Sequence, residues 1–218
     1  MNMMKIRLFL MSVMTLLIST ACNSKATSNT PDGEQLSSEA DAVPVKNGGK
    51  VLVVFFSHTG DNYSVGNIKV GNTKKVADLI AEKTGADMFE IKTSKYDGMA
   101  YTPLCDLAKE EQQKGELPPF EGVIENIEQY STIFIGGPVW WGTYPQVMFT
   151  FFKKYDLNGK TLIPFTTHEG SGLGSCAKDV QKAYPNATMK KGLAIRGTDA
   201  QDGSAAGRVE KWLTELGF

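Results

Sequence analysis

The sequence predicts an α/β fold, a doubly wound five-stranded parallel sheet, on three observations. Apolar runs typical of strands alternate with segments of helical periodicity five times between residues 50 and 218. The first run, residues 51–56, is apolar throughout, as expected of a strand that is buried on both faces. Polar, glycine-rich loops follow the first, third and fourth runs, and ligands bind at the carboxyl ends of the strands in sheets of this kind.

The expected elements, in chain order, are Lys50–Phe56 (strand), 74–83 (helix), 86–91 (strand), 102–114 (helix), 131–135 (strand), 146–155 (helix), 161–165 (strand), 173–183 (helix), 187–195 (strand) and 203–216 (helix). The first helix has its apolar residues on one face, and Gly85 ends it. Pro103 near the start and Gly115 after the end bound the second helix. Aromatic residues dominate the third helix, which indicates that it is buried. The remaining elements complete the alternation.

The amino-terminal residues 1–21 resemble a bacterial lipoprotein signal. Lys5 and Arg7 form a basic start, and the apolar stretch 8–18 is too short to cross a bilayer as a helix. Small residues then precede Cys22, which we expect to become the lipidated mature N-terminus. The protein would then be exported and anchored by its lipid to the bacterial cell envelope, on the periplasmic or the outer surface. An ordinary secretory signal with a nearby cysteine is the alternative, because Ser19 stands where Leu or Val is more usual.

Residues 22–49 are rich in Ser, Asn, Ala and acidic residues and have no apolar periodicity, so they predict a flexible tether. The chain is therefore expected to consist of a signal, 1–21, a tether, 22–49, and one domain, 50–218. The formal net charge of −1 provides no electrostatic basis for binding nucleic acid.

The cysteines and histidines predict no metal site, since no group of them has the spacing of metal ligands. Besides Cys22, the chain has two cysteines, Cys105 and Cys176. An even number in an oxidising compartment leaves a disulfide open, and two buried thiols are the favoured alternative.

The loop after the first strand has the composition of a phosphate-binding loop. Hydroxyl groups and backbone N–H groups can donate to a phosphate, and the N-terminus of the following helix adds partial positive charge. The residues expected to take part are Ser57, His58, Thr59, Gly60, Asn72 and Thr73. Simple capping of backbone groups in the loop is an equally supported role for His58.

Two further loops carry aromatic and polar groups suited to a flat ring. The third strand leads into Gly136-Gly-Pro-Val-Trp-Trp-Gly142, where an exposed tryptophan offers a stacking face. The fourth strand leads into Thr167-His-Glu-Gly-Ser-Gly172, which can form hydrogen bonds to the edge of a ring. The sequence leaves open which tryptophan stacks, and one of the two is expected to pack in or near the core.

These three loops together resemble the flavodoxin family, and in particular its members with Gly-x-Pro-x-Trp-Trp-Gly and Thr-x-x-Gly-Ser-Gly loops. The resemblance covers residues 50–218 and implies a flavodoxin-like strand order, 2-1-3-4-5, with FMN as the cofactor. In the family the first loop holds the FMN phosphate, and the two later loops contact the isoalloxazine ring. The further cofactor-binding residues implied are Pro138, Val139, Trp140, Trp141, Gly142, Thr167, His168, Glu169, Gly170 and Gly172.

One departure from the family concerns the phosphate loop, in which residues 61–70 separate Gly60 from Asn72. A helix that began at Asn62 would contain Gly66 and Gly71, at a cost of about 1 kcal/mol each. We therefore expect one phosphate site interrupted by an insertion, which either folds over the ligand or disrupts the site.

Two other interpretations of the glycine-rich loops are not supported. The stretch 66–73 nearly matches a nucleotide-binding P-loop, but Asn72 replaces the lysine that contacts the phosphates. The stretch 169–173 nearly matches the nucleophile elbow of an esterase, but Glu169 replaces its first glycine.

The resemblance implies an FMN-binding redox protein. Its activity would be electron transfer to an unknown redox partner or NAD(P)H-dependent reduction of a small quinone-like acceptor. The near-neutral charge favours a reductase or a weakly steered carrier, since simple carriers of the family are often strongly acidic. A non-redox binding protein on a flavodoxin scaffold, with tight FMN binding lost through the insertion 61–70, is the alternative.

Overall fold

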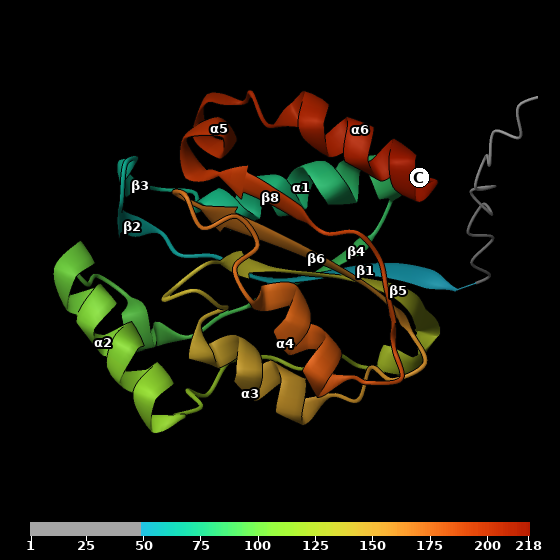
Figure 1. Cartoon of the computed structure of the whole chain (residues 1–218), viewed down its shortest axis with the longest axis horizontal. Coiled ribbons are helices and arrows are strands. Elements are labelled where there is room, and N and C mark those ends of the chain that lie inside the picture. Colours follow the sequence, from blue (N-terminus) through green and yellow to red (C-terminus); the bar gives the residue numbers. More distant parts are fainter. Residues whose placement is uncertain (1–48) are drawn as a thin grey trace, which may run out of the picture. The chain divides into compact units, whose positions relative to one another are not determined.

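The computed structural model describes residues 49–218, which form a parallel sheet between two layers of helices (Figure 1). The strands are β1 (Lys50–Phe56), β2 (Gly60–Asn62), β3 (Gly66–Ile68), β4 (Asp87–Ile91), β5 (Tyr130–Pro138), β6 (Thr161–His168), β7 (Thr188–Met189) and β8 (Leu193–Arg196). The α-helices are α1 (Asn72–Thr84), α2 (Tyr101–Lys114), α3 (Gln146–Lys154), α4 (Cys176–Ala183), α5 (Gly197–Asp202) and α6 (Ala206–Leu216). Two 3₁₀ turns, η1 (Ser94–Tyr96) and η2 (Ile127–Gln129), precede α2 and β5.

The main sheet has the order β4-β1-β5-β6, with β7 and β8 both paired to β6 at the far edge, and all of its pairs are parallel. This is the predicted order, 2-1-3-4-5, so the α/β fold class is confirmed. Helices α1, α5 and α6 cover one face of the sheet, and α2, α3 and α4 cover the other (Figure 1).

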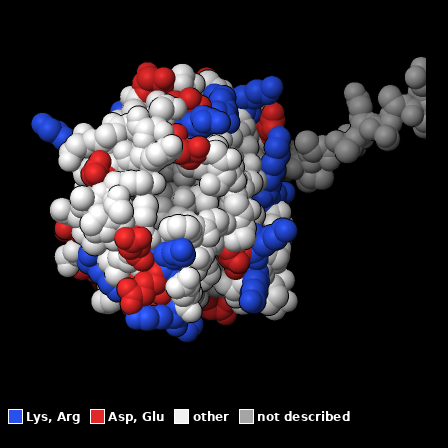
Figure 2. All heavy atoms as spheres, turned by 60° about the vertical axis from the view of Figure 1, so that its left-hand side comes forward, with Lys and Arg blue, Asp and Glu red and all other residues white. Residues whose placement is uncertain are grey.

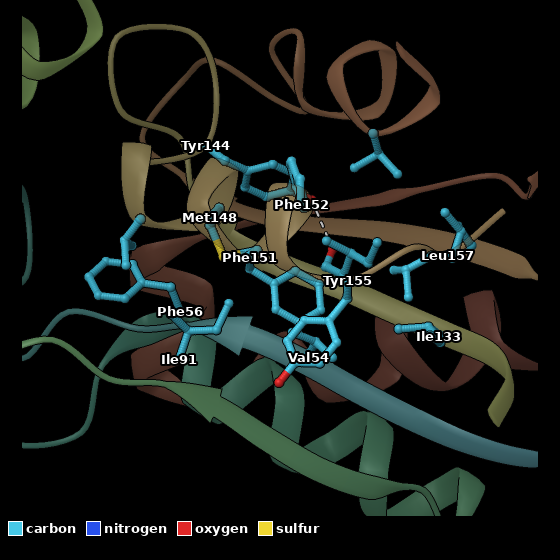
Figure 3. Packing of buried hydrophobic residues seen from close by; sticks show 14 of the residues in the cluster. Val54, Phe56, Ile91, Ile133, Tyr144, Met148, Phe151, Phe152, Tyr155 and Leu157 are labelled. Atoms are coloured by element: carbon cyan, nitrogen blue, oxygen red, sulfur yellow. Dashed lines mark hydrogen bonds between the residues drawn. The ribbon is translucent and has the colours of Figure 1, made fainter. Parts of the chain in front are cut away.

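Alternate residues of a strand point to opposite faces of the sheet and pack in two different hydrophobic cores. In β1, Leu52, Val54 and Phe56 pack on the side of α3, whereas Val53 and Phe55 pack under α1 and α6. Figure 3 shows the first of these cores, in which Val54 and Phe56 of β1 belong to the same cluster as Met148 and Phe151 of α3. Because both faces are covered, neither face of β1 needs polar residues, which explains its continuous apolar run.

The predicted strand 187–195 is two short strands, and Pro164 in the neighbouring β6 gives a physical reason. The Lys190 N–H donates to the Leu162 carbonyl, so the backbone N–H and C=O groups of Leu162 point towards β7 and β8. The same groups of every second residue along β6 point in this direction. Pro164 is one of these residues and has no N–H to donate. The hydrogen-bonded pairing of β6 with β7 therefore ends before Pro164, and pairing of β6 with β8 begins at Phe165 and Leu193.

The last predicted helix, 203–216, starts later than expected, and a short helix precedes it. Gly203 has a φ of +86°, and this left-handed residue ends α5. Helix α6 then begins at Ala206. The sequence pattern gave no signal for α5, since six residues are too few to show helical periodicity.

The insertion 61–70 contains a β-hairpin in which β2 and β3 pair antiparallel and only with each other. Ser64, in the turn, has a φ of 64°. Figure 1 shows the hairpin above α2, at the edge of the sheet where β1 ends. Within residues 49–218, no helix is long and apolar enough to span a membrane.

Candidate functional site

The loops at the carboxyl ends of β1, β5 and β6 meet at the N-terminus of α1 and border a crevice of about 230 Å³. Seven predicted site residues line this crevice: Asn72, Pro138, Val139, Trp140, Thr167, His168 and Glu169. Four residues that the sequence did not single out line it as well: Asn62, Tyr63, Tyr101 and Ser171. Figure 2 shows this side of the molecule, where charged side chains gather towards the rim and the hollowed centre is largely uncharged.

The two halves of the predicted phosphate loop come together across the insertion. The Ser57 hydroxyl accepts a hydrogen bond from the Lys74 N–H, with 2.9 Å between Oγ and N, and so caps the first turn of α1. Gly71 packs so closely against this loop that an added Cβ would lie 2.2 Å from Ser57 Oγ and 2.5 Å from the His58 carbonyl oxygen. Gly71 therefore lets β1 and α1 meet as they would without the insertion.

The N-terminus of α1 presents polar groups to the crevice. The N-cap residue Gly71 has no side chain, so it provides no side-chain cap for the N–H groups of Asn72 and Thr73. Gln201 donates to the side-chain oxygen of Asn72 at 2.7 Å, which orients the Asn72 amide. The hydroxyl groups of Thr73 and Thr167 lie 2.8 Å apart and connect α1 to the end of β6.

The two tryptophans have different roles. Trp140 is half-buried, and its ring meets Phe56, Tyr96 and His58 edge to face. Trp141 is 49% exposed and points to α2 instead, where its indole N–H donates to the Cys105 carbonyl at 2.8 Å.

The turn that carries the two tryptophans is tightly built. Trp141 and Gly142 have φ values of 50° and 87°, and Trp140 and Thr143 exchange backbone hydrogen bonds across them. The Gly142 carbonyl accepts from the Ser175 N–H at 2.8 Å, which joins this turn to the loop after β6. Only Trp140 of the two tryptophans borders the crevice.

The loop after β6 supplies two titratable groups. His168 Nδ1 accepts from the Gly170 N–H at 2.9 Å, and burial and then Arg196 lower the pKa of His168. Burial raises the pKa of the Glu169 carboxyl, while the charge of Arg196 opposes this shift. The Ser64 hydroxyl of the hairpin also interacts with Glu169, so the insertion reaches across to this loop.

Ser57, His58 and Thr59 border a separate polar cavity of about 250 Å³ beside the end of β4. His58 is buried, and its Nε2 has no hydrogen-bond partner in the described part of the chain. Burial lowers the pKa of His58, and the charges of Asp97 and Asp61 act in the opposite direction. The remaining six predicted residues border neither space; they are Gly60, Thr73, Trp141, Gly142, Gly170 and Gly172.

The hairpin of the insertion and the start of α2 line a further side of the crevice. The Asp61 carboxylate accepts the Tyr101 N–H at 3.0 Å and caps α2. The rings of Tyr63 and Tyr101 lie 5.7 Å apart. The general rule that ligands bind at strand ends would have pointed to Tyr101, which begins the helix after β4.

Both Cys105 and Cys176 are free, so the disulfide that the sequence left open is not formed. Burial raises the pKa of the Cys176 thiol to about 12. No group of three or more metal-ligating side chains occurs in residues 49–218.

Comparisons with solved structures and with a family model agree with each other. Two Bacteroides proteins assigned as flavoproteins have similar structures. The protein from B. uniformis has a TM-score of 0.60 and 29% identity over 77% of this chain and 99% of its own. The protein from B. eggerthii has a TM-score of 0.57 and 27% identity over 78% and 99%.

A flavoprotein from Lactobacillus acidophilus, solved in complex with FMN, shares the fold, with a TM-score of 0.53 and 20% identity over 71% of this chain and 97% of its own. No curated protein sequence matches significantly. The family model for flavodoxins matches residues 50–215, which is nearly all of the described domain. Together with the sheet order and the loops at the strand ends, this match shows that the chain belongs to the flavodoxin family.

Proposed function

We propose that this chain binds FMN noncovalently and uses it either for electron transfer to a redox partner or for NAD(P)H-dependent reduction of a small quinone-like acceptor. The carrying observation is the crevice at the strand ends, which adjoins the N-terminus of α1, where the N-cap residue Gly71 has no side chain. Membership in the flavodoxin family supports FMN as the ligand, and so does the FMN bound by the L. acidophilus protein of the same fold.

The polar groups at the start of α1 fit a phosphate. The N–H groups of Asn72 and Thr73 and the side-chain amide of Asn72 are neutral donors, and the helix dipole favours an anion at this end. No lysine or arginine lines the crevice as far as the described residues go. The phosphate would therefore be held by neutral N–H donors rather than by a cation.

The half-buried Trp140 and the loop after β6 fit a flat ring. Trp140 is held by aromatic neighbours and can keep one orientation beside the ligand. His168 and Glu169 can form hydrogen bonds to ring edges, and Tyr63 of the hairpin limits the access of water. FMN supplies the redox chemistry when bound, and the chain supplies binding, orientation and shielding.

The net charge of −1 bears on the choice between the two activities. Strong charge of one sign steers a carrier towards its partner, and this chain lacks it. The chain has no second nucleotide-binding motif in its sequence, so NAD(P)H would bind only transiently at the crevice. The weak charge therefore supports a reductase or a weakly steered carrier.

An absorption spectrum tests the cofactor proposal. Protein that is loaded with FMN and desalted should retain flavin bands and quench flavin fluorescence. Asn72→Ala should weaken FMN binding by about 1–3 kcal/mol, because a polar donor that lines the crevice at the start of α1 is lost. Thr188→Ala is the matched control, since Thr188 is exposed at the opposite end of the sheet, and it should leave the affinity unchanged.

A colourless protein from which FMN washes away would contradict the proposal. It would favour the alternative, a non-redox binding protein, for which the hairpin across the crevice is the supporting observation. Addition of NAD(P)H to the loaded protein separates the two redox activities, because a reductase bleaches the flavin bands without a protein partner.

We also propose, from the sequence alone, that Cys22 carries a lipid that anchors the exported protein to the cell envelope. Residues 1–48 lie outside the described part of the chain. Cells grown with a clickable fatty acid should label the protein, and Cys22→Ser should abolish the label. Persistent labelling of that variant would contradict the assignment.

A further inference from the structure

We propose that a second cavity, next to the crevice, binds a neutral aromatic molecule of about two fused rings. In the proposed redox function this molecule would be the electron acceptor. Its role as acceptor therefore rests on the proposed function. The cavity has a volume of about 340 Å³, within the range of small-ligand sites. We refer to it as the α2 cavity, because Leu104, Cys105 and Ala108 of α2 form one wall.

Two apolar walls give the α2 cavity its preference for a flat ring. Leu104 and Ala108 form the side on α2, and Val139, Trp140 and Trp141 form the side on the turn after β5. Aromatic side chains offer large, rigid surfaces for stacking. A flat apolar ligand would therefore bury its faces here, whereas a strongly hydrated one would lose its water without compensation.

Trp141 is fixed in place by α2. Its indole N–H donates to the Cys105 carbonyl at 2.8 Å, its own carbonyl accepts from the Gln112 side chain at 3.2 Å, and Lys109 lies over its ring, 4.8 Å from the centroid. It holds a left-handed φ of 50°, which is unfavourable for a residue other than glycine. Strained residues held this firmly cluster at ligand sites, and the α2 cavity is the space that Trp141 borders.

The polar part of the lining selects against anions. Asp61 is the only carboxylate that lines the cavity, and no lysine or arginine lines it in the described part of the chain. The Asp61 carboxylate also faces the N-terminus of α2 through its bond to Tyr101. A neutral ligand avoids repulsion by this carboxylate, and the side chains of Asn62 and Tyr101 supply hydrogen-bonding groups for a hydroxyl or carbonyl.

The α2 cavity adjoins the crevice proposed for FMN. The two spaces share the residues Asn62, Tyr101, Val139 and Trp140. Both lie on the side of the molecule seen in Figure 2. A ligand in the α2 cavity would therefore lie next to the cofactor, where an electron acceptor has to bind.

Two inert probes test the site without any turnover. 2-Naphthalenemethanol and 2-naphthalenesulfonate share one ring system and differ in charge. Isothermal titration of the full-length protein, loaded with FMN and free of it, should show binding of the alcohol and at least about tenfold weaker binding of the sulfonate. Asp61→Asn, which can still accept from the Tyr101 N–H, should reduce this difference to about threefold or less. Asp97→Asn is the matched control outside the α2 cavity and should keep the full difference.

A filling variant tests the location. Ala108→Leu should abolish binding of the alcohol, because the added side chain occupies the cavity. The flavin spectrum and the melting temperature check that this variant is folded and loaded. In the unchanged protein, the alcohol should shift the indole N–H resonance of Trp141, identified from Trp141→Phe, in NMR spectra.

Equal binding of both probes, no binding of the alcohol, or full binding by Ala108→Leu would each overturn the inference. Flavin bands are recorded on the same samples. Their absence contradicts the proposed redox function, whereas loss of probe binding with intact flavin bands contradicts only the α2 cavity as a ligand site.

Discussion

Gly71 shows how one residue decides whether the phosphate loop can form. Its backbone approaches Ser57 and His58 too closely for any side chain. The His58 carbonyl belongs to the backbone and cannot rotate away, so a larger residue must displace the loop. The insertion is tolerated because the chain regains the N-terminus of α1 at a residue without a Cβ.

Gly71→Ala should lower the free energy of unfolding by about 1–3 kcal/mol, as overpacking does elsewhere. FMN affinity should fall by about tenfold or more, since the Ser57 loop and the start of α1 separate. Urea unfolding and FMN titration measure the two effects. Gly207→Ala in α6 is the control, because its Cβ meets nothing within 4 Å, and it should stabilise the protein by about 0.5–1 kcal/mol. Unchanged FMN affinity in Gly71→Ala would contradict the assigned loop.

His58 should make stability depend on pH. Burial lowers its pKa from 6.5 in the folded protein, whereas the unfolded chain takes up a proton at the ordinary value. As the pH falls below 6.5, the unfolded state binds more protons, so stability decreases. The decrease should be at most about 1.4 kcal/mol per pH unit for this one group.

His58→Gln should remove this dependence, which unfolding at pH 7.5, 6.5 and 5.5 would detect. The difference between the parent and this variant is the relevant quantity, because other groups titrate as well. Burial also lowers the pKa of His168, so this group changes the stability in the same direction. Glu169 has a raised pKa, so it adds stability as the pH falls through the window just above 4.5. Parallel pH curves for parent and variant would contradict the assignment to His58.

At the scale of elements, the β2–β3 hairpin covers the crevice but adds nothing to the main sheet. Its strands pair only with each other. Its Asp61 and Tyr63 contact Tyr101 at the start of α2. Its Ser64 interacts with Glu169 in the loop after β6. These contacts make the hairpin a wall of the site rather than a support of the fold.

Deletion of residues 61–70, which joins Gly60 to Gly71, should leave a folded protein that releases FMN faster, on the order of tenfold. The cause is the loss of Tyr63 and Asn62 from the crevice. Recovery of flavin fluorescence after dilution measures the release rate. Tyr63→Ala is the smaller change and should give an intermediate rate. A release rate equal to that of the parent would show that the hairpin does not retain FMN.

At the scale of the whole molecule, both hydrophobic cores lie between residues 51 and 218. A chain that starts at Gly49 should therefore fold by itself, with a melting temperature within about 2 °C of that of the full-length protein. Its FMN affinity should also be unchanged, since every residue of the crevice is retained. Calorimetry and FMN titration test this, and a large loss of either would assign a structural role to residues before 49.

The sequence alone determined the layers, the strand order implied by the resemblance and the three loops at the strand ends, because these depend on local periodicity and on glycine-rich motifs. Tertiary structure decided the rest. The two strands opposite Pro164 depend on a neighbour far away in the chain. The different positions of Trp140 and Trp141 depend on a turn with left-handed residues.

The same holds for the site. The sequence predicted seven of the residues that line the crevice. Tyr63 and Tyr101 line it as well, because the hairpin packs against α2. Contacts between such distant segments depend on packing and burial in three dimensions, which the periodicity of a single chain does not encode. The sequence therefore determined the family and the edge of the sheet that holds the site, and the tertiary structure decided which side chains border it.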